Sequence, residues 1–164
     1  MYEVEKDWMS YDLRCIVIMG DRGHRCGYVG VDENHPLFEL DYFDRVPSKL
    51  ITKWEEIQKE EIGKRGVVDL LCHDFDKPKI GILFDVHGGI TYSGGGEMSS
   101  YPIESDLWWF GYDCAHLGDG KYLFALSETQ REIESRFPTH GILRTLNYCV
   151  VECESLAKQL GDLK

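Results

Sequence analysis

Two short stretches in the middle of the chain combine aspartate, histidine and glycine at spacings that could support chemistry. Asp85 and His87 precede a pair of glycines, and Asp113 and His116 follow a later aromatic run. Carboxylate and imidazole groups bind Zn²⁺, Mn²⁺ or Fe²⁺, and such a metal activates water for attack on a phosphodiester or an amide. These four residues are therefore one candidate set of metal ligands. The sequence has no HExxH or comparable metal signature to support them.

The same residue types allow two other interpretations. Neutral histidine and ionised aspartate can hold a ribose, an amide or a base edge, with Trp109 or a tyrosine stacked on a ring. Alternatively, Asp85 and Asp113 fix turns through their own backbone while His87 and His116 satisfy carbonyl groups. Residue types and spacing do not separate a metal site from a recognition site or a structural role.

Neighbouring residues add weaker signals. Three consecutive glycines, 94–96, follow Ser93 and could expose backbone N–H groups to an anion, although a plain hairpin tip accounts for them equally well. No GKS or GKT sequence follows, so this is not a phosphate-binding Walker loop. Ser93 lacks the G-x-S-x-G context of a nucleophile, and Cys114 follows an acid that would raise its thiol pKa.

The apolar runs predict the strands that position these residues. Residues 13–19 read as a strand buried on both faces, and a turn at 20–23 pairs it with a strand over 25–31. Residues 1–12 either add an edge strand or pack over the core. A strand over 80–84 would place Asp85 and His87 on one face at its end. A strand over 107–111 would send Trp108 and Trp109 to opposite faces.

Three helices are predicted. One begins at Ser48 and runs to about residue 62, a second has a capping box at Ser127 and Gln130 and ends before Pro138, and the last spans about 142–160. Its apolar stripe faces the core. Residues 32–47 form a long ordered loop whose histidine, at position 35, either lines a site or lies on the surface.

The composition of the chain limits the fold classes and the kinds of partner that are possible. The 164 residues carry 18 Lys+Arg against 29 Asp+Glu, a net charge of −11, which disfavours duplex nucleic acid. No 18-residue apolar run or secretory signal is present, so we expect a cytoplasmic protein without a membrane partner. We predict a single α+β domain over 1–164, with an antiparallel or mixed sheet flanked by two to three helices.

Further polar clusters have ordinary structural explanations. The six cysteines form no CxxC pair and lie in apolar runs, which predicts buried thiols. His73 with Asp74 and Asp76 could hold a metal, but a polar turn before Pro78 is the preferred interpretation.

Longer stretches of the chain resemble a known group of proteins. The segments GYVGVDENHPLF, DVHGGITYSG, WWFGYDCAHLGD and RTLNYCVVECESLAKQL are similar to small, mostly uncharacterised proteins encoded by bacteriophages and prophages. The resemblance covers most of the chain from Cys26 onward. It implies a site that includes Asp119 together with the ligand-binding candidates His87, Gly88, Gly89, Tyr92, Ser93, Trp109, Asp113 and His116.

Small phage proteins of this size often antagonise host defence, and some sequester nucleotide immune signals. The resemblance therefore implies a protein of the host-cell cytoplasm that binds a small nucleotide-derived ligand without a cofactor. Separately, the two-helix acidic surface with its tryptophans leads us to expect a homo-oligomer. Two alternatives remain open. One is a metal-dependent phosphohydrolase with Asp85, His87, Asp113 and His116 as ligands of a divalent metal, and the other is a non-enzymatic protein-interaction module.

Overall fold

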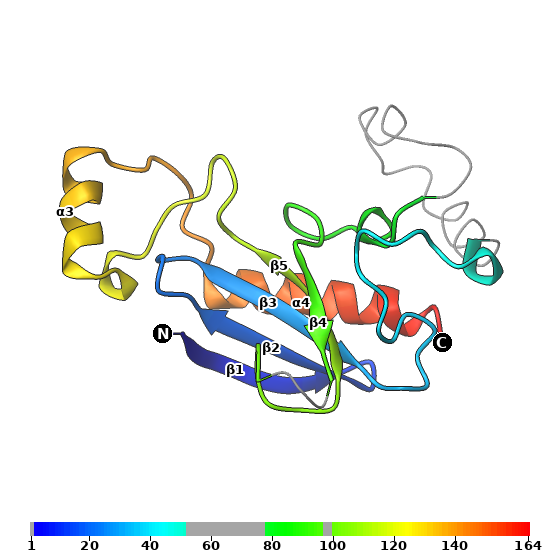
Figure 1. Cartoon of the computed structure of the whole chain (residues 1–164). Helices are drawn as coiled ribbons and strands as arrows, with labels where there is room; N and C mark the ends of the chain where they lie inside the picture. Colours follow the sequence, from blue (N-terminus) through cyan, green and yellow to red (C-terminus); the bar gives the residue numbers. More distant parts are fainter. Residues whose placement is uncertain (1, 52–77, 97–99) are drawn as a thin grey trace.

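The chain forms a five-stranded antiparallel sheet with helices, an α+β arrangement as predicted (Figure 1). The computed structural model describes residues 2–51, 78–96 and 100–164. The spatial order of the strands is β1-β2-β3-β5-β4. Their bounds are β1 Glu3–Ser10, β2 Leu13–Met19, β3 Arg25–Val31, β4 Tyr92–Gly95 and β5 Trp108–Asp113. The predicted hairpin of β2 and β3 is confirmed, and residues 3–10 supply the edge strand.

Alternation along the strands divides the core between the two faces of the sheet. Cys15 and Val17 of β2 belong to a large cluster that helix α4 (Leu146–Gly161) covers, whereas Ile16 and Ile18 belong to a smaller cluster on the other face. The continuous apolar run of β2 therefore reflects burial on both faces, as predicted.

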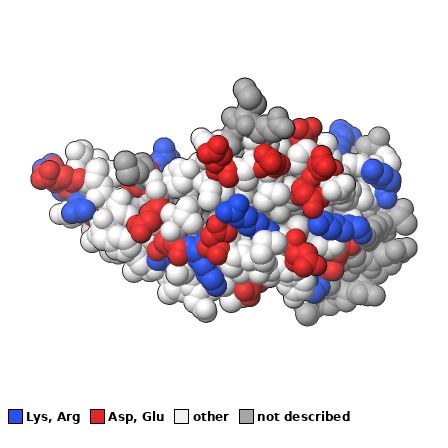
Figure 2. All heavy atoms as spheres, turned by 90° about the horizontal axis from the view of Figure 1, so that it is seen from below, with Lys and Arg blue, Asp and Glu red and all other residues white. Residues whose placement is uncertain are grey.

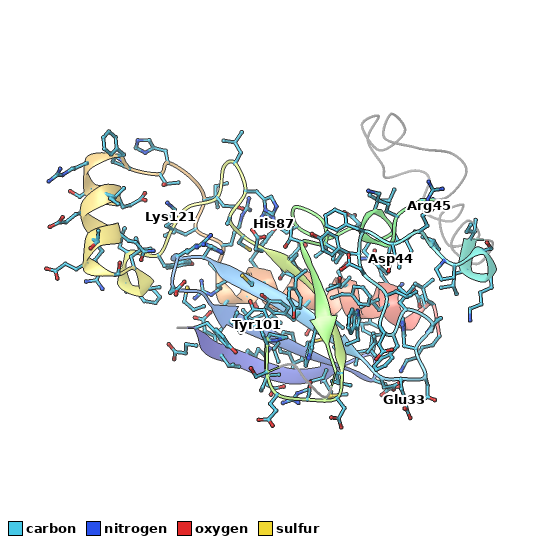
Figure 3. All side chains as sticks on the ribbon, viewed as in Figure 1. Glu33, Asp44, Arg45, His87, Tyr101 and Lys121 are labelled. Atoms are coloured by element: carbon cyan, nitrogen blue, oxygen red, sulfur yellow. The ribbon has the colours of Figure 1, made fainter. Side chains whose placement is uncertain are left out.

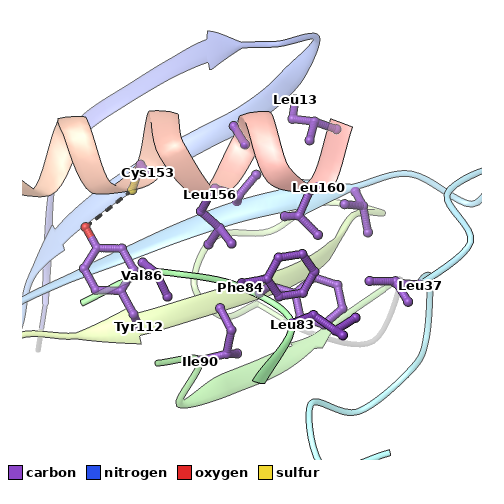
Figure 4. Close-up of a cluster of buried hydrophobic side chains, with 14 of the residues drawn as sticks. Leu13, Leu37, Leu83, Phe84, Val86, Ile90, Tyr112, Cys153, Leu156 and Leu160 are labelled. Carbon is purple, nitrogen blue, oxygen red and sulfur yellow. Dashed lines mark hydrogen bonds between the residues drawn. The ribbon is translucent and has the colours of Figure 1, made fainter. Parts of the chain in front are cut away.

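The large cluster brings α4 close to the sheet (Figure 4). Tyr112 of β5 donates its hydroxyl to the carbonyl of Cys149, 2.8 Å away, and packs beside Cys153. A Cβ atom at Gly27 would lie 2.5 Å from the Tyr112 ring and 2.6 Å from the Cys153 sulfur. Glycine at position 27 is therefore what lets helix and sheet approach this closely.

Two of the three predicted helices are confirmed, the last with a shifted start. The capping box of Ser127 and Gln130 is present, and α3 spans Glu128–Arg136. Helix α4 begins four residues later than predicted, because the Thr145 side chain caps it by accepting from the Tyr148 amide. Residues 48–51 are helical, whereas the rest of the first predicted helix and the His73 cluster lie outside the described residues.

The strand predicted over 80–84 is wrong. Ile80–Ile82 form a short 3₁₀ helix (η1), and the chain then crosses the core as a buried loop. The Gln159 side chain of α4 satisfies the backbone here, because its amide oxygen accepts from Asp85 N and its amide nitrogen donates to Asp85 O, each at 2.8 Å. A side chain distant in sequence thus replaces the neighbouring strand that a ladder would require.

Other local expectations change in detail. Gly94 and Gly95 belong to β4 and pair with β5, so this part of the glycine run is neither a hairpin tip nor an anion-binding loop. His35 is buried and its Nε2 lies 3.0 Å from the Leu160 carbonyl, so it neither lines the site described below nor lies on the surface. The five described cysteines are buried free thiols, as expected.

Two surface properties bear on possible partners. Acidic and basic side chains are interspersed on the face shown in Figure 2, and that face has no broad basic area of the kind that binds duplex nucleic acid. Within the described residues, no helix combines the length and the apolar character that crossing a membrane requires.

Candidate functional site

A nearly buried carboxylate, Asp119, organises a polar centre where the loop after β5 meets the start of α4. Its side chain is only 2% exposed. Oδ2 accepts hydrogen bonds from His87 Nε2 at 2.8 Å and from the His116 amide at 3.0 Å, while Oδ1 accepts from Arg144 Nε at 2.7 Å. Three separate segments of the chain therefore converge on one carboxylate. Figure 3 labels one of the contributing side chains, His87.

These hydrogen bonds control the charge of Asp119. Burial alone would raise its pKa, but the bonds from Arg144, His87 and the His116 amide outweigh burial and lower the pKa from its ordinary value. The carboxylate is therefore ionised at neutral pH, so it accepts hydrogen bonds and donates none. His87 must accordingly carry a proton on Nε2 in this arrangement.

Helix α4 holds the other side of the His87 ring. His87 Nδ1 lies 3.0 Å from the Tyr148 hydroxyl, and the His87 amide donates to Glu152 Oε2 at 2.7 Å. Burial and the nearby Glu152 raise the pKa of Tyr148. Its phenol therefore keeps its proton at neutral pH and can donate to His87, which fixes both nitrogens of the ring.

The His116 ring also lies at this centre, packed directly against Gly88. The ring lies so close to Gly88 that a Cβ atom there would be 2.0 Å from His116 Cε1, and Gly88 has a φ of +67°. His116 Nδ1 is buried and has no hydrogen-bond partner in the described part of the chain. Its nearest carboxylate oxygens, on Asp113 and Asp119, lie 3.8 and 3.9 Å away.

This geometry is compatible with a cation. One ligand atom each from His87, His116 and Asp119 lies within 4.8 Å of the others. Counting the ionised groups around them, three carboxylates (Asp113, Asp119 and Glu152) face one guanidinium (Arg144), a formal charge of −2. Two imidazoles and a carboxylate are ligands that Zn²⁺, Mn²⁺ and Fe²⁺ share.

The structure separates the residues that the sequence grouped together. His87, Gly88, His116 and Asp113 lie at the centre, and Gly89 adjoins it in the same turn. Asp85 is exposed, and its backbone bonds to the Gln159 side chain, outside the cluster.

The aromatic candidates lie elsewhere. Trp109 is fully buried in the smaller core cluster, where Nε1 donates to Ser105 Oγ at 3.0 Å. Tyr92 packs edge-on against Tyr28 in that cluster. Ser93 Oγ accepts from the Tyr42 amide at 3.0 Å. None of these three contacts involves the histidines.

Three residues at the centre escaped the sequence analysis, namely Arg144, Tyr148 and Glu152. The last two are four residues apart and so share one side of α4. Their spacing is a local signal for a polar side of this helix, opposite in character to the apolar stripe that faces the core. Arg144 also places its guanidinium 4.9 Å from the centre of the Tyr148 ring.

Comparisons with known proteins add no information about this centre. No protein-family model, curated protein or solved structure matches the chain.

Proposed function

We propose that the protein is a metal-dependent hydrolase that cleaves a phosphate ester bond in a small nucleotide-derived compound. The observation that carries this proposal is the convergence of His87, His116 and Asp119, whose ligand atoms lie within 4.8 Å of one another. The unpartnered Nδ1 of His116 supports it, because a buried nitrogen without a partner is costly unless a ligand completes it.

The charges around the centre favour a cation there before any anion. A formal charge of −2 repels a phosphate, whereas a divalent ion would balance it. A bound ion would take the place of the proton on His87 Nε2; the ring proton would then lie on Nδ1 and be donated to the Tyr148 hydroxyl, while Arg144 orients the carboxylate. A metal bound at such a site polarises a phosphoryl oxygen and lowers the pKa of water.

The guanidinium of Arg144 is the reason to expect a phosphate group in the substrate. Only Nε of its guanidinium bonds to Asp119, and its two terminal NH₂ groups make no hydrogen bond to the described residues. A guanidinium fixed at one nitrogen can present the other two to phosphate oxygens. The nucleotide part of the substrate follows from the resemblance to phage proteins, in which the compound would be an immune signal of the host.

Sequestration of such a ligand without cleavage is a second candidate, because the free side of Arg144 can bind a phosphate in either case. Nanomolar sequestration requires about 12 kcal/mol of binding free energy, which an enclosed pocket with stacking usually provides. Trp109 is fully buried on the other face of the sheet and does not offer its ring for stacking at this centre. The geometry therefore favours hydrolysis.

One experiment separates the two candidates. The purified protein is incubated with a panel of linear and cyclic nucleotides, with Mn²⁺ or Zn²⁺ and with chelator, and the released compounds are identified by mass spectrometry. We expect a cleaved product that chelator abolishes and that His116→Ala abolishes, whereas His140→Ala, at an exposed histidine outside the cluster of His87, His116 and Asp119, retains turnover.

Two other outcomes would change the proposal. Intact ligand that is depleted from solution and recovered after denaturation would replace hydrolysis with sequestration. A panel that remains free and unchanged in every condition would reject both candidates.

A further inference from the structure

The charges around the Asp119 centre restrict the kind of phosphate ester that it can hold, an inference that rests on the proposed function. Asp113, Asp119 and Glu152 bring three negative charges, and Arg144 brings one positive charge. The two histidines of the centre are neutral when they bind a metal through a ring nitrogen. A single divalent ion held by these histidines and Asp119 therefore brings the formal charge from −2 to zero. No net positive charge is left over for a substrate.

Within the described residues, Arg144 is the only lysine or arginine that forms an ion pair with this cluster. Two basic side chains on adjoining segments are paired elsewhere. Arg25 donates to both carboxylate oxygens of Glu5, at 2.6 and 2.8 Å, and Lys121 Nζ lies 3.1 Å from Glu134. In the part of the chain that the structure describes, the centre therefore has no second cation to balance an additional negative charge.

Arg144 is fixed at both ends. Its carbonyl oxygen accepts from Arg25 Nη1 at 2.8 Å and from the Tyr122 hydroxyl at 3.1 Å. At the other end, Nε donates to Asp119, and the guanidinium lies 4.9 Å from the centre of the Tyr148 ring. The two terminal NH₂ groups therefore have a set position beside the proposed metal ligands. A planar guanidinium held in this way offers its donors to a single phosphate group.

Phosphate esters differ in their charge. A diester carries one negative charge, whereas a monoester at neutral pH carries a charge of about −1.5 to −2. With one divalent ion bound, a diester would leave the centre at about −1 and a monoester would leave it close to −2. Like charges repel more strongly in a partly buried site than in water, so the charge of the centre favours the diester.

The unesterified oxygens lead to the same conclusion. A diester has two of them, and a metal ion can polarise one while Arg144 binds the other. A monoester has a third, for which the described residues of the centre supply no further cation. The charged groups that remain there, Asp113 and Glu152, are both carboxylates. A terminal phosphate would therefore meet repulsion where it needs a hydrogen-bond donor.

We propose that the substrate of this centre is a phosphodiester and that terminal phosphate groups are excluded. Water attacks the phosphorus atom, a new P–O bond forms, and the bond from phosphorus to one ester oxygen breaks. One proton of the water goes to the departing oxygen, so the products are an alcohol and a phosphate monoester. The monoester loses its second proton with a pKa of about 6 and becomes a dianion. The repulsion that excludes terminal phosphates then favours release of this product.

The test compares matched pairs of esters on the full-length protein with Mn²⁺ or Zn²⁺. One pair is bis(p-nitrophenyl) phosphate and p-nitrophenyl phosphate, which share a chromogenic leaving group. The other is a dinucleoside monophosphate and the corresponding mononucleotide, followed by mass spectrometry. We expect kcat/KM for the diester to exceed that for the monoester by roughly tenfold or more in at least one pair. The monoester should also inhibit diester cleavage poorly, with an inhibition constant roughly tenfold or more above the diester KM.

Charge-neutralising variants test the physical cause of this selectivity. Asp113→Asn and Glu152→Gln each remove one negative charge and keep an oxygen that accepts from a backbone amide. Each should raise the ratio of monoester to diester kcat/KM by roughly threefold or more, since water and salt weaken the repulsion that is removed. Glu132→Gln, at an exposed carboxylate of α3, is the matched control and should leave the ratio unchanged. Circular dichroism checks that each variant keeps its fold.

The outcomes separate this inference from the proposed function. A monoester cleaved as efficiently as its diester would overturn the inference and leave the metal-dependent hydrolase in place. A ratio that responds to neither Asp113→Asn nor Glu152→Gln would overturn it as well, because charge would then not be the cause. No cleavage of either pair with either metal would reject the proposed function and the inference together.

Discussion

On the face of the sheet that α4 covers, polar side chains gather at the edge around Asp119, whereas on the other face tyrosine hydroxyls bond among themselves. Tyr28 and Tyr101 share a hydrogen bond between their hydroxyls, and Tyr92 donates to the Tyr101 carbonyl at 3.3 Å. At the Asp119 centre, by contrast, His116 Nδ1 has no hydrogen-bond partner among the described residues.

Residues that are close together in the sequence serve different purposes on the two faces of the sheet. His87 and Tyr92 are five residues apart in the chain, yet the first reaches the Asp119 centre and the second packs in the aromatic cluster on the other face. Trp109 likewise lies in the aromatic cluster while His116, in the next loop, reaches the centre. The aromatic cluster should therefore govern stability, and the Asp119 centre should govern chemistry.

The largest expected effect comes from the aromatic cluster. Trp109→Ala should lower the free energy of unfolding by about 3–5 kcal/mol, because it removes a fully buried ring and leaves a cavity. Urea denaturation measures the loss. At a temperature where the variant is still folded, its affinity for Zn²⁺ should match the wild type, and a selective loss of metal affinity would contradict the division between the two faces.

A substitution at the other face should show the opposite pattern. Asp119→Asn should lower the unfolding free energy by about 2 kcal/mol, because Arg144 and His87 lose an ionised partner in a buried position. Its affinity for Zn²⁺, measured by competition with a chromogenic chelator, should fall by roughly 10–100-fold or more. Unchanged affinity would exclude Asp119 as a ligand.

The fold was predictable from the sequence where the signals are local. The β2–β3 hairpin follows from a buried run, a turn and a second run, and the helix capped by Ser127 follows from a capping box. The run at 80–84 failed because a short apolar segment does not distinguish a strand from a buried loop. Gln159, which decides between them, is more than 70 residues away.

The candidate site was predictable only in part for the same reason. Sequence spacing brought out His87 and His116, and the resemblance added Asp119. Their partners Arg144 and Tyr148 come from the start of α4, and no local pattern shows that this end of the helix packs beside the loop after β5. Asp85 was wrongly placed on one face with His87, because the strand that would have aligned them does not exist.

Glycine at position 88 offers a sharper test of the centre. Gly88→Ala should cost about 1–2 kcal/mol for the left-handed backbone, and its Cβ would displace the His116 ring. Gly89→Ala is the matched control, since Gly89 also has a positive φ (+83°) but its Cβ would meet no atom within 4 Å. Both variants should lose similar stability, and only Gly88→Ala should lose Zn²⁺ affinity. Equal affinities would show that the position of His116 does not matter.

Lowering the pH should reveal the ionisation of Asp119 through a smaller change in the free energy of unfolding. Its pKa is lower in the folded protein than the ~3.9 of an unfolded chain, so the stabilisation is complete above that value and is lost as the pH falls through the folded pKa. The difference in unfolding free energy between the wild type and Asp119→Asn should therefore shrink below about pH 4. A difference that stays constant down to pH 2 would contradict the lowered pKa.

The smallest effect is expected at Tyr92, and it bears directly on the division between the two faces. Tyr92→Phe keeps the ring against Tyr28 and removes only a hydroxyl that donates over 3.3 Å, a long hydrogen bond. We expect a loss of about 0.5 kcal/mol in urea denaturation, at the lower end for a hydrogen bond. Zn²⁺ affinity and turnover should not change, because the hydroxyl donates to the Tyr101 carbonyl in the aromatic cluster. If turnover instead fell with stability intact, the substrate would have to reach across the sheet, and the aromatic cluster would belong to the functional site after all.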